Sequence, residues 1–106
     1  MIKWKDVKGY EGLYCISSAG DIYSLKRKQY ITPFETEYGY LKATLSKDSI
    51  KRNKKVDKLV AEHFILNPNN YPCVRHLDND IKNNNADNLA WCTLGEAAKY
   101  YKEYRA

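Results

Sequence analysis

A run of Asn and Asp residues between positions 78 and 88 is the most polar segment of the chain. Such side chains hydrogen-bond to nearby backbone groups, so they favour loops over regular helix or strand. The β-favouring stretch 73–77 enters this loop, and Thr93 with Glu96 forms a capping box that begins a helix after it. The C-terminal part of the chain is therefore predicted to be a short strand, a long polar loop and a helix.

The first 45 residues predict a small antiparallel sheet of hairpins. Short β-favouring runs at 13–16 and 21–25 are separated by the turn-forming segment 17–21. Residues 38–45 alternate apolar with polar side chains, as a half-buried strand does. We expect no helix before about residue 55.

The basic stretch 51–55 is expected to be a strand or loop that leads into a short amphipathic helix. The apolar residues that share one face of this helix are Val56, Leu59, Val60 and Phe64. The Asn- and Pro-rich stretch 67–72 ends the helix. The result is an α+β chain in which helices follow the sheet.

The chain has 106 residues, which is enough for one compact domain. No linker stands out, so we expect a β-rich module at 1–50 and a second core at 51–106, packed as one unit. The net charge of +5 suits an anionic partner, although surface lysines also serve solubility alone. No apolar run approaches the roughly 20 residues that span a bilayer, so we expect a cytoplasmic protein.

The three cysteines predict neither disulfides nor a zinc site. They are odd in number, far apart and without a C-x-x-C pair, which favours a reducing compartment. A metal site joining Cys73, His76 and Cys92 with His63 would match no zinc spacing.

The segment 73–93 resembles the core of the HNH nucleases encoded by phages and introns. The matching residues are Val74, His76, Asp78, Asn83, Asn84, Asn88, Leu89, Trp91 and Thr93. Earlier residues look like the modular motif that precedes this core in phage homing endonucleases: Trp4, Asp6, Gly9 to Gly12, Tyr14, Ser17, Gly20, Tyr23 and Ser24. The resemblance implies a small antiparallel β module packed with a ββα-metal motif. In the connecting helix, Asp57 and Lys58 replace the family's usual His-Arg pair.

The resemblance also implies roles for individual residues. His76 is in the position of the general base, although it could equally be a structural histidine, and Asn88 is in that of the Asn that cross-links the loop. The metal-ligand positions carry Arg75 and, in an ungapped alignment, Ala97, which offer a hard cation no donor. We therefore expect no metal, unless one inserted residue brings Glu96 into place, or Asp78 and Asp80 substitute.

Two basic clusters are candidates for nucleic-acid binding. Together with Arg75, whose planar guanidinium suits phosphate, these candidates are Lys26, Arg27, Lys28, Lys51, Arg52, Lys54 and Lys55. Each cluster alone could instead be a solvated surface. DNA is the expected partner ahead of RNA.

Three functions follow from these observations. The first is a catalytically degenerate HNH protein of phage origin, located in the host cell of a phage or mobile element. It binds nucleic acid or inhibits a nuclease or defence complex, as an anti-CRISPR does. The second is an active HNH DNA endonuclease of the homing type that uses Mg²⁺ or Mn²⁺. The third is an architectural DNA-binding accessory to a larger phage machine. The residues at the ligand positions favour binding over cleavage, and the oligomeric state is left open.

Overall fold

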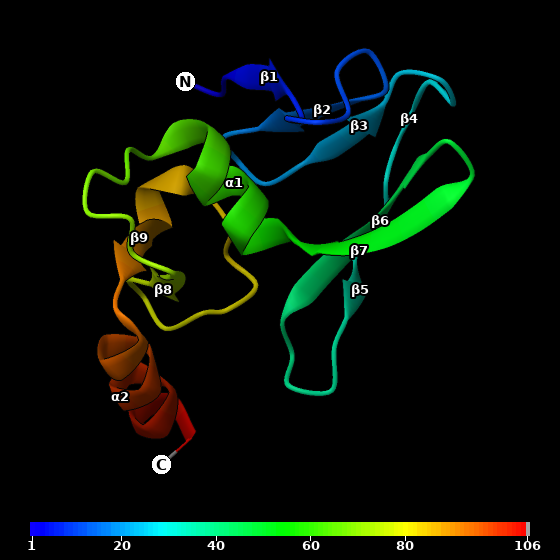
Figure 1. Cartoon of the computed structure of the whole chain (residues 1–106). Coiled ribbons are helices and arrows are strands. Elements are labelled where there is room, and N and C mark those ends of the chain that lie inside the picture. Colours follow the sequence, from blue (N-terminus) through cyan, green and yellow to red (C-terminus); the bar gives the residue numbers. More distant parts are fainter. Residues whose placement is uncertain (106) are drawn as a thin grey trace.

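The computed structural model describes the backbone of residues 1–105 and the side chains of residues 1–99. Within this part, three antiparallel sheets surround one central helix, and a second helix follows at the C-terminal end (Figure 1). The α+β class predicted from the sequence is confirmed.

The first sheet contains four short strands in sequential order. They are β1 (Trp4–Asp6), β2 (Tyr14–Ser17), β3 (Ile22–Ser24) and β4 (Gln29–Tyr30). The predicted turn at 17–21 joins β2 to β3, and the Ser17 hydroxyl accepts the amides of Ala19 at 3.2 Å and Asp21 at 3.0 Å. Gly20 in this turn has φ +96°, a conformation that favours glycine.

The second sheet is formed by β5 (Phe34–Glu35), β6 (Leu41–Lys47) and β7 (Ile50–Lys55). Asp48 and Ser49 connect β6 to β7 with φ values of 53° and 65°, as a two-residue hairpin turn requires. The basic stretch 51–55 lies within β7 and is thus a strand. The strand predicted at 38–45 is misplaced, because Gly39, with φ +88°, lies in the preceding turn and the strand begins only at Leu41.

The predicted amphipathic helix is α1 (Val56–Phe64), and it fills the space between the sheets. Its buried face joins one apolar core with both sheets and β9. The core residues are Val7, Tyr10, Tyr14, Ile16, Ile22, Ala43, Leu45, Val56, Leu59, Val60 and Leu89. This core holds α1 in a fixed position against the N-terminal strands.

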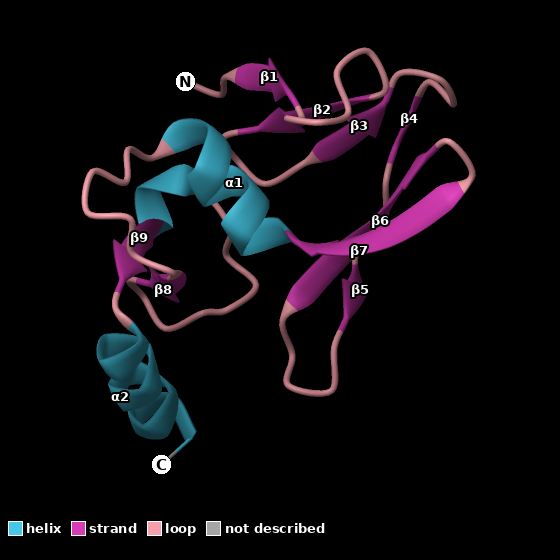
Figure 2. Ribbon diagram, viewed as in Figure 1, coloured by secondary structure: helices cyan, strands magenta, loops and turns pink. Residues whose placement is uncertain are grey.

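The third sheet is a two-stranded ribbon of β8 (Cys73–His76) and β9 (Leu89–Cys92), which packs against α1. The 3-10 helix η1 (Ala86–Asn88) precedes β9, and α2 (Leu94–Arg105) follows it and extends away from the sheets (Figure 2). The predicted capping box is confirmed, since Thr93 Oγ1 accepts the Glu96 amide at 3.1 Å and Glu96 Oε1 accepts the Thr93 amide at 3.3 Å. Neither α-helix, as far as it is described, has the length and apolar character needed to cross a membrane.

Candidate nuclease-type site

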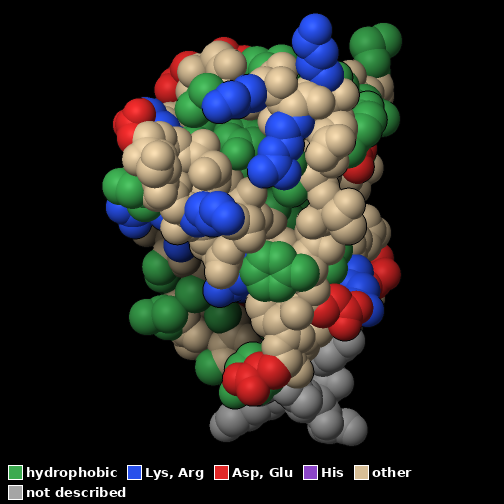
Figure 3. All heavy atoms as spheres, turned by 90° about the vertical axis from the view of Figure 1, so that its right-hand side faces the viewer, with side chains coloured by type: hydrophobic (Ala, Val, Ile, Leu, Met, Phe, Trp, Pro, Cys, Tyr) green, Lys and Arg blue, Asp and Glu red, His purple; other side chains and the backbone are tan. Residues whose placement is uncertain are grey.

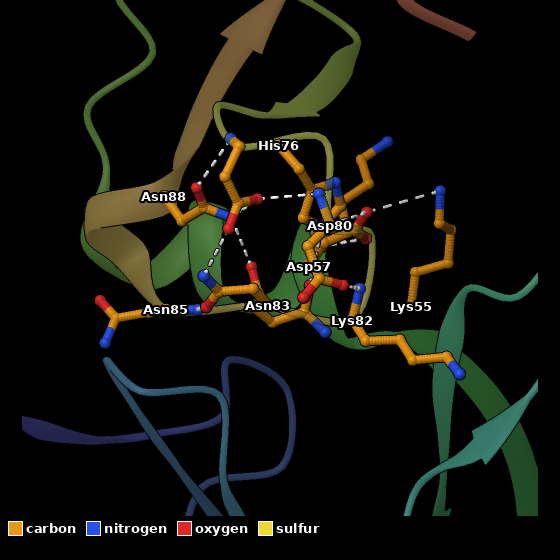
Figure 4. Close-up of polar contacts among 11 residues, drawn as sticks. Lys55, Asp57, His76, Asp80, Lys82, Asn83, Asn85 and Asn88 are labelled. Carbon is orange, nitrogen blue, oxygen red and sulfur yellow. Dashed lines mark hydrogen bonds and ion pairs between the residues drawn. The ribbon is translucent and has the colours of Figure 1, made fainter. Parts of the chain in front are cut away.

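The polar loop between β8 and β9 is closed by the side chain of Asn88. Its amide nitrogen donates to Asp78 Oδ1 at 2.8 Å and to the Asn83 carbonyl at 2.9 Å (Figure 4). Its amide oxygen accepts the Asp78 backbone N–H at 3.1 Å. The loop is therefore fixed by specific hydrogen bonds, although it has little apolar content of its own.

The Asp78 carboxylate collects several donors from the same loop. The Asn83 side chain donates to it at 3.0 Å, the Asp80 amide at 2.8 Å and Asn88 at 2.8 Å. These bonds, that from Asn83 first, lower the pKa of Asp78 below its ordinary value. The carboxylate is thus an ionised acceptor within the loop.

One turn and one strand from the earlier part of the chain support the loop from outside. The Ala86 amide donates to the Ser18 carbonyl at 2.7 Å, and Gly20 lies so close to Asn84 that an added Cβ would be 3.2 Å from the Asn84 Cβ. On another side, Lys82 forms an ion pair with Glu35 on β5. The loop is therefore held by both the β2–β3 turn and the second sheet.

His76 lies at the end of β8 and is buried, with 5 % of its surface exposed. Its Nε2 lies 2.8 Å from Asn84 Oδ1. An amide oxygen only accepts, so in this orientation of the Asn84 side chain the bond requires the tautomer with its proton on Nε2. No described hydrogen bond involves the other ring nitrogen, Nδ1.

Asp57 approaches the same imidazole nitrogen from the first turn of α1. Its Oδ2 lies 3.9 Å from His76 Nε2 and 3.7 Å from Lys55 Nζ, and its side chain is buried (Figure 4). Its Oδ1 accepts the Lys58 amide at 2.6 Å, whereas Oδ2 has no hydrogen-bond partner. A carboxylate near the N-terminus of a helix is stabilised by the helix dipole, which favours this burial.

The oxygen and nitrogen donors near His76 do not fit a conventional hard-cation site. Arg75 and Ala97 have no suitable atom, Asp78 is occupied within the loop, and Asp80 Oδ1 accepts the Lys82 amide at 3.0 Å. Glu96 caps α2, as its position in the sequence predicts. Among the described residues no group of three or more His, Cys, Asp or Glu is arranged to hold a metal. His63 could not join Cys73 and Cys92 either, because both its ring nitrogens are hydrogen-bonded elsewhere.

Arg75 lies on β8 beside Cys92 and is partly buried. Burial raises the pKa of the Cys92 thiol, and the positive charge of Arg75 opposes that rise. Three hollows on the sheets are lined by basic candidates, and Arg75 lines none of them.

The two basic clusters meet on the outer side of the sheets. Arg27, from the β3–β4 turn, and Lys51, from β7, line one hollow of about 360 Å³ together with Tyr30. Lys26 and Arg27 line a neighbouring hollow of about 670 Å³. Lys and Arg side chains are visible across the upper part of this side of the molecule (Figure 3).

The remaining basic candidates lie in three other places. Arg52 and Lys54 line a separate hollow of about 390 Å³ with Lys8. Lys55 points inward, with its ammonium 4.2 Å from the centre of the Tyr40 ring and close to Asp57. Lys28 lies in the exposed β3–β4 turn. The basic residues therefore form more than one surface.

Sequence reasoning did not assign a role to Asn84, Asp57 or Gly20. Asn84 was only one matching position in the motif, and its contact with His76 spans the whole loop. For Asp57, the available signal was the replacement of the family's His-Arg pair by an acidic residue and a lysine. Gly20 was predicted as a turn residue and as one matching position of the modular motif.

Comparison with known proteins places these features in a family. Residues 3–46 match the NUMOD4 motif. An uncharacterized HNH endonuclease of Acanthamoeba polyphaga mimivirus is 40 % identical over 80 residues, covering 76 % of this chain and 24 % of that protein. DNA endonuclease I-HmuI of Bacillus phage SP01 is 36 % identical over 92 residues, covering 87 % of this chain and 53 % of that protein.

A solved structure agrees with the sequence comparison. The structure of the HNH homing endonuclease I-HmuI, described for its DNA binding and cleavage, matches with a TM-score of 0.86 and 32 % identity. The match covers 95 % of this chain and 58 % of the other. The chain thus spans about a quarter to somewhat over half the length of these relatives. The chain belongs to the HNH homing endonuclease family, with a NUMOD4 motif followed by an HNH-type core.

Proposed function

We propose that this chain binds double-stranded DNA through the surface formed by the β3–β4 turn and β7. The observation that carries this proposal is that Arg27 and Lys51, from the two separate basic clusters, line one hollow with Tyr30. Arginine and lysine neutralise phosphates and release counterions, and a tyrosine hydroxyl can donate to a phosphate oxygen. A DNA-binding relative of the same fold supports DNA as the partner.

Binding is tested by fluorescence anisotropy with a labelled DNA duplex over a range of salt concentrations. The Arg27→Gln and Lys51→Gln substitutions should each weaken binding and reduce the slope of log K against log salt by about 1. Lys3→Gln is the matched control, because this lysine borders none of the basic hollows described above. Equal slopes for all three variants, or tighter binding to an RNA duplex of the same sequence, would contradict the proposal.

We infer that this chain is a binding protein whose HNH site does not hydrolyse DNA as it stands, and the donor set around His76 supports this inference. Arg75 and Ala97 remove the cation's protein ligands, and the carboxylates of Asp78, Asp80 and Glu96 are hydrogen-bonded within their own segments. We compare plasmid cleavage, with Mg²⁺ or Mn²⁺, by the natural chain, His76→Ala, and the double variant Arg75→Asp, Ala97→Asn. The natural chain should be inactive, and cleavage should appear when the ligands are restored.

An active homing-type endonuclease is the second candidate function. The position of His76, with one ring nitrogen free of described hydrogen bonds, favours it, as do relatives that are named endonucleases. Cleavage by the natural chain that His76→Ala abolishes would establish this candidate. For either function we propose the cytoplasm of a host cell as the location, which the phage and viral origin of the relatives supports. None of the described contacts and none of these relatives points to a nuclease or defence complex as partner, so we name DNA alone.

A further inference from the structure

Two acceptor groups from distant parts of the chain converge on one nitrogen of His76. Asn84 Oδ1 lies 2.8 Å from Nε2, and Asp57 Oδ2 lies 3.9 Å from the same atom. We propose that Asp57 and Asn84 are positioning residues that keep the proton of the neutral imidazole on Nε2 and leave the lone pair on Nδ1. This inference goes beyond DNA binding and does not depend on it.

Asp57 decides which tautomer His76 adopts. An asparagine side chain by itself could turn either its oxygen or its NH₂ group toward Nε2, and these two arrangements favour opposite tautomers. A buried negative charge beside Nε2 attracts a proton there and repels a lone pair. The carboxylate therefore selects the arrangement in which Asn84 accepts and His76 donates.

Asp57 is fixed well enough to exert this effect. Its side chain is 4 % exposed, and its Oδ1 is bound to the Lys58 amide at 2.6 Å. Its Oδ2 has no hydrogen bond, so its charge acts on its two near neighbours, Lys55 Nζ and His76 Nε2. Lys55 is in turn held over the Tyr40 ring. The Asp57 carboxylate therefore keeps a fixed position close to both the Lys55 ammonium and the His76 ring.

The N-terminal module holds Asn84, the second acceptor, in place. An added Cβ at Gly20 would lie only 3.2 Å from both the Cβ and the carbonyl oxygen of Asn84. The amide of Ala86, two residues after Asn84, donates to the Ser18 carbonyl. The NUMOD4 motif, α1 and the loop therefore all contribute to the orientation of one imidazole. With Nε2–H engaged, Nδ1 is the atom that can accept a proton from water or a hydrogen bond from a ligand.

The tautomer is measured by long-range ¹H–¹⁵N NMR of the imidazole nitrogens, at a pH where the rings are neutral. His63 is an internal control of the opposite kind, because its Nδ1 faces the Leu59 carbonyl at 2.7 Å and its Nε2 accepts the Lys8 amide at 2.8 Å. The chain has two histidines, so a His63→Gln variant assigns both spectra. We expect the Nε2–H pattern for His76 and the Nδ1–H pattern for His63.

Asp57→Asn tests the role of the charge with almost no change in shape. The Nδ1–H form of His76 should increase about tenfold relative to the Nε2–H form, while the His63 pattern stays unchanged. Asn84→Asp, which keeps an acceptor, should retain the natural pattern, whereas Asn84→Leu, which removes this acceptor but keeps the Asp57 charge, should retain the Nε2–H form in a smaller excess. An Nδ1–H pattern for His76 in the natural chain, or identical spectra for Asp57→Asn and the natural chain, would overturn the proposal. No DNA is needed, so a failure to bind DNA leaves this test intact.

Discussion

Different kinds of interaction stabilise the two halves of the molecule, which are the sheets with α1 and the loop between β8 and β9. The sheets and α1 share an apolar core in which Ile16, Leu45 and Val60 are completely buried. The loop between β8 and β9 depends instead on hydrogen bonds among Asn and Asp side chains, centred on Asn88 and Asp78. A site that must present polar atoms cannot be built from apolar packing, so the family joins a polar loop to an apolar support.

The two histidines show the same contrast on a smaller scale. Both ring nitrogens of His63 bind backbone groups, of Leu59 and Lys8, and so connect α1 to the segment after β1. His76 instead meets only side chains at Nε2, those of Asn84 and Asp57. A substitution can replace a side-chain partner and so change the hydrogen bonding of the ring, whereas a backbone partner stays in place. We therefore interpret His63 as structural and His76 as the residue available for chemistry.

The largest effect should come from the apolar half. Leu45→Ala removes a fully buried side chain from the β6–β7 hairpin and should lower the free energy of unfolding by about 3 kcal/mol, measured by urea denaturation. Ile50→Ala is the control on the same hairpin, where the side chain is 54 % exposed, and it should change stability by less than about 0.5 kcal/mol. Equal losses in the two variants would mean that this core does not support the fold.

Asn88→Ala should be the most damaging change within the polar loop. It removes the hydrogen bonds to Asp78 and Asn83, one of them to a charged group, and should cost about 2 kcal/mol. Amide hydrogen exchange should accelerate in residues 77–88 more than in the sheets. Asn69→Ala, at an exposed position before β8, is the matched control. A uniform acceleration over the whole chain would contradict the division between the two halves.

The sequence predicted the apolar half better than the polar site. Alternation and helical periodicity located β6 in part and α1 fully, because these patterns reflect burial on one face. The strands β1, β4 and β5 have two or three residues with exposed side chains, so no pattern marks them. The convergence of Asp57 and Asn84 on His76 depends on how α1 packs against β8, which local sequence does not encode.

His63→Leu should have a smaller effect, because the lost hydrogen bonds lie at a partly exposed position. Leucine fills a similar volume but removes the hydrogen bonds of the imidazole with the Lys8 amide and the Leu59 carbonyl. The free energy of unfolding, measured by urea denaturation, should fall by about 1 kcal/mol. Glu62→Ala, at the exposed neighbouring position on α1, should be neutral. The tautomer of His76 should not change in the His63→Leu variant. A change would show that the two histidines are coupled.

The smallest effect expected is the acid sensitivity of the loop. Hydrogen bonds, that from Asn83 first, lower the pKa of Asp78 in the folded state. The contribution of Asp78 to stability is therefore fully present above the pKa of this group in the unfolded state. It is lost as pH falls through the pKa in the folded state. The protection factors of the loop amides, which correct for the slower intrinsic exchange at low pH, should therefore fall at acidic pH, while those in the sheets change less. Asn83→Ala should raise the pKa of Asp78 toward its ordinary value and move this transition to higher pH. Asn85→Ala, which removes a loop bond to Asp87 but none to Asp78, should leave the transition where it is, and a shift in that variant would show that acid acts on the loop through another group.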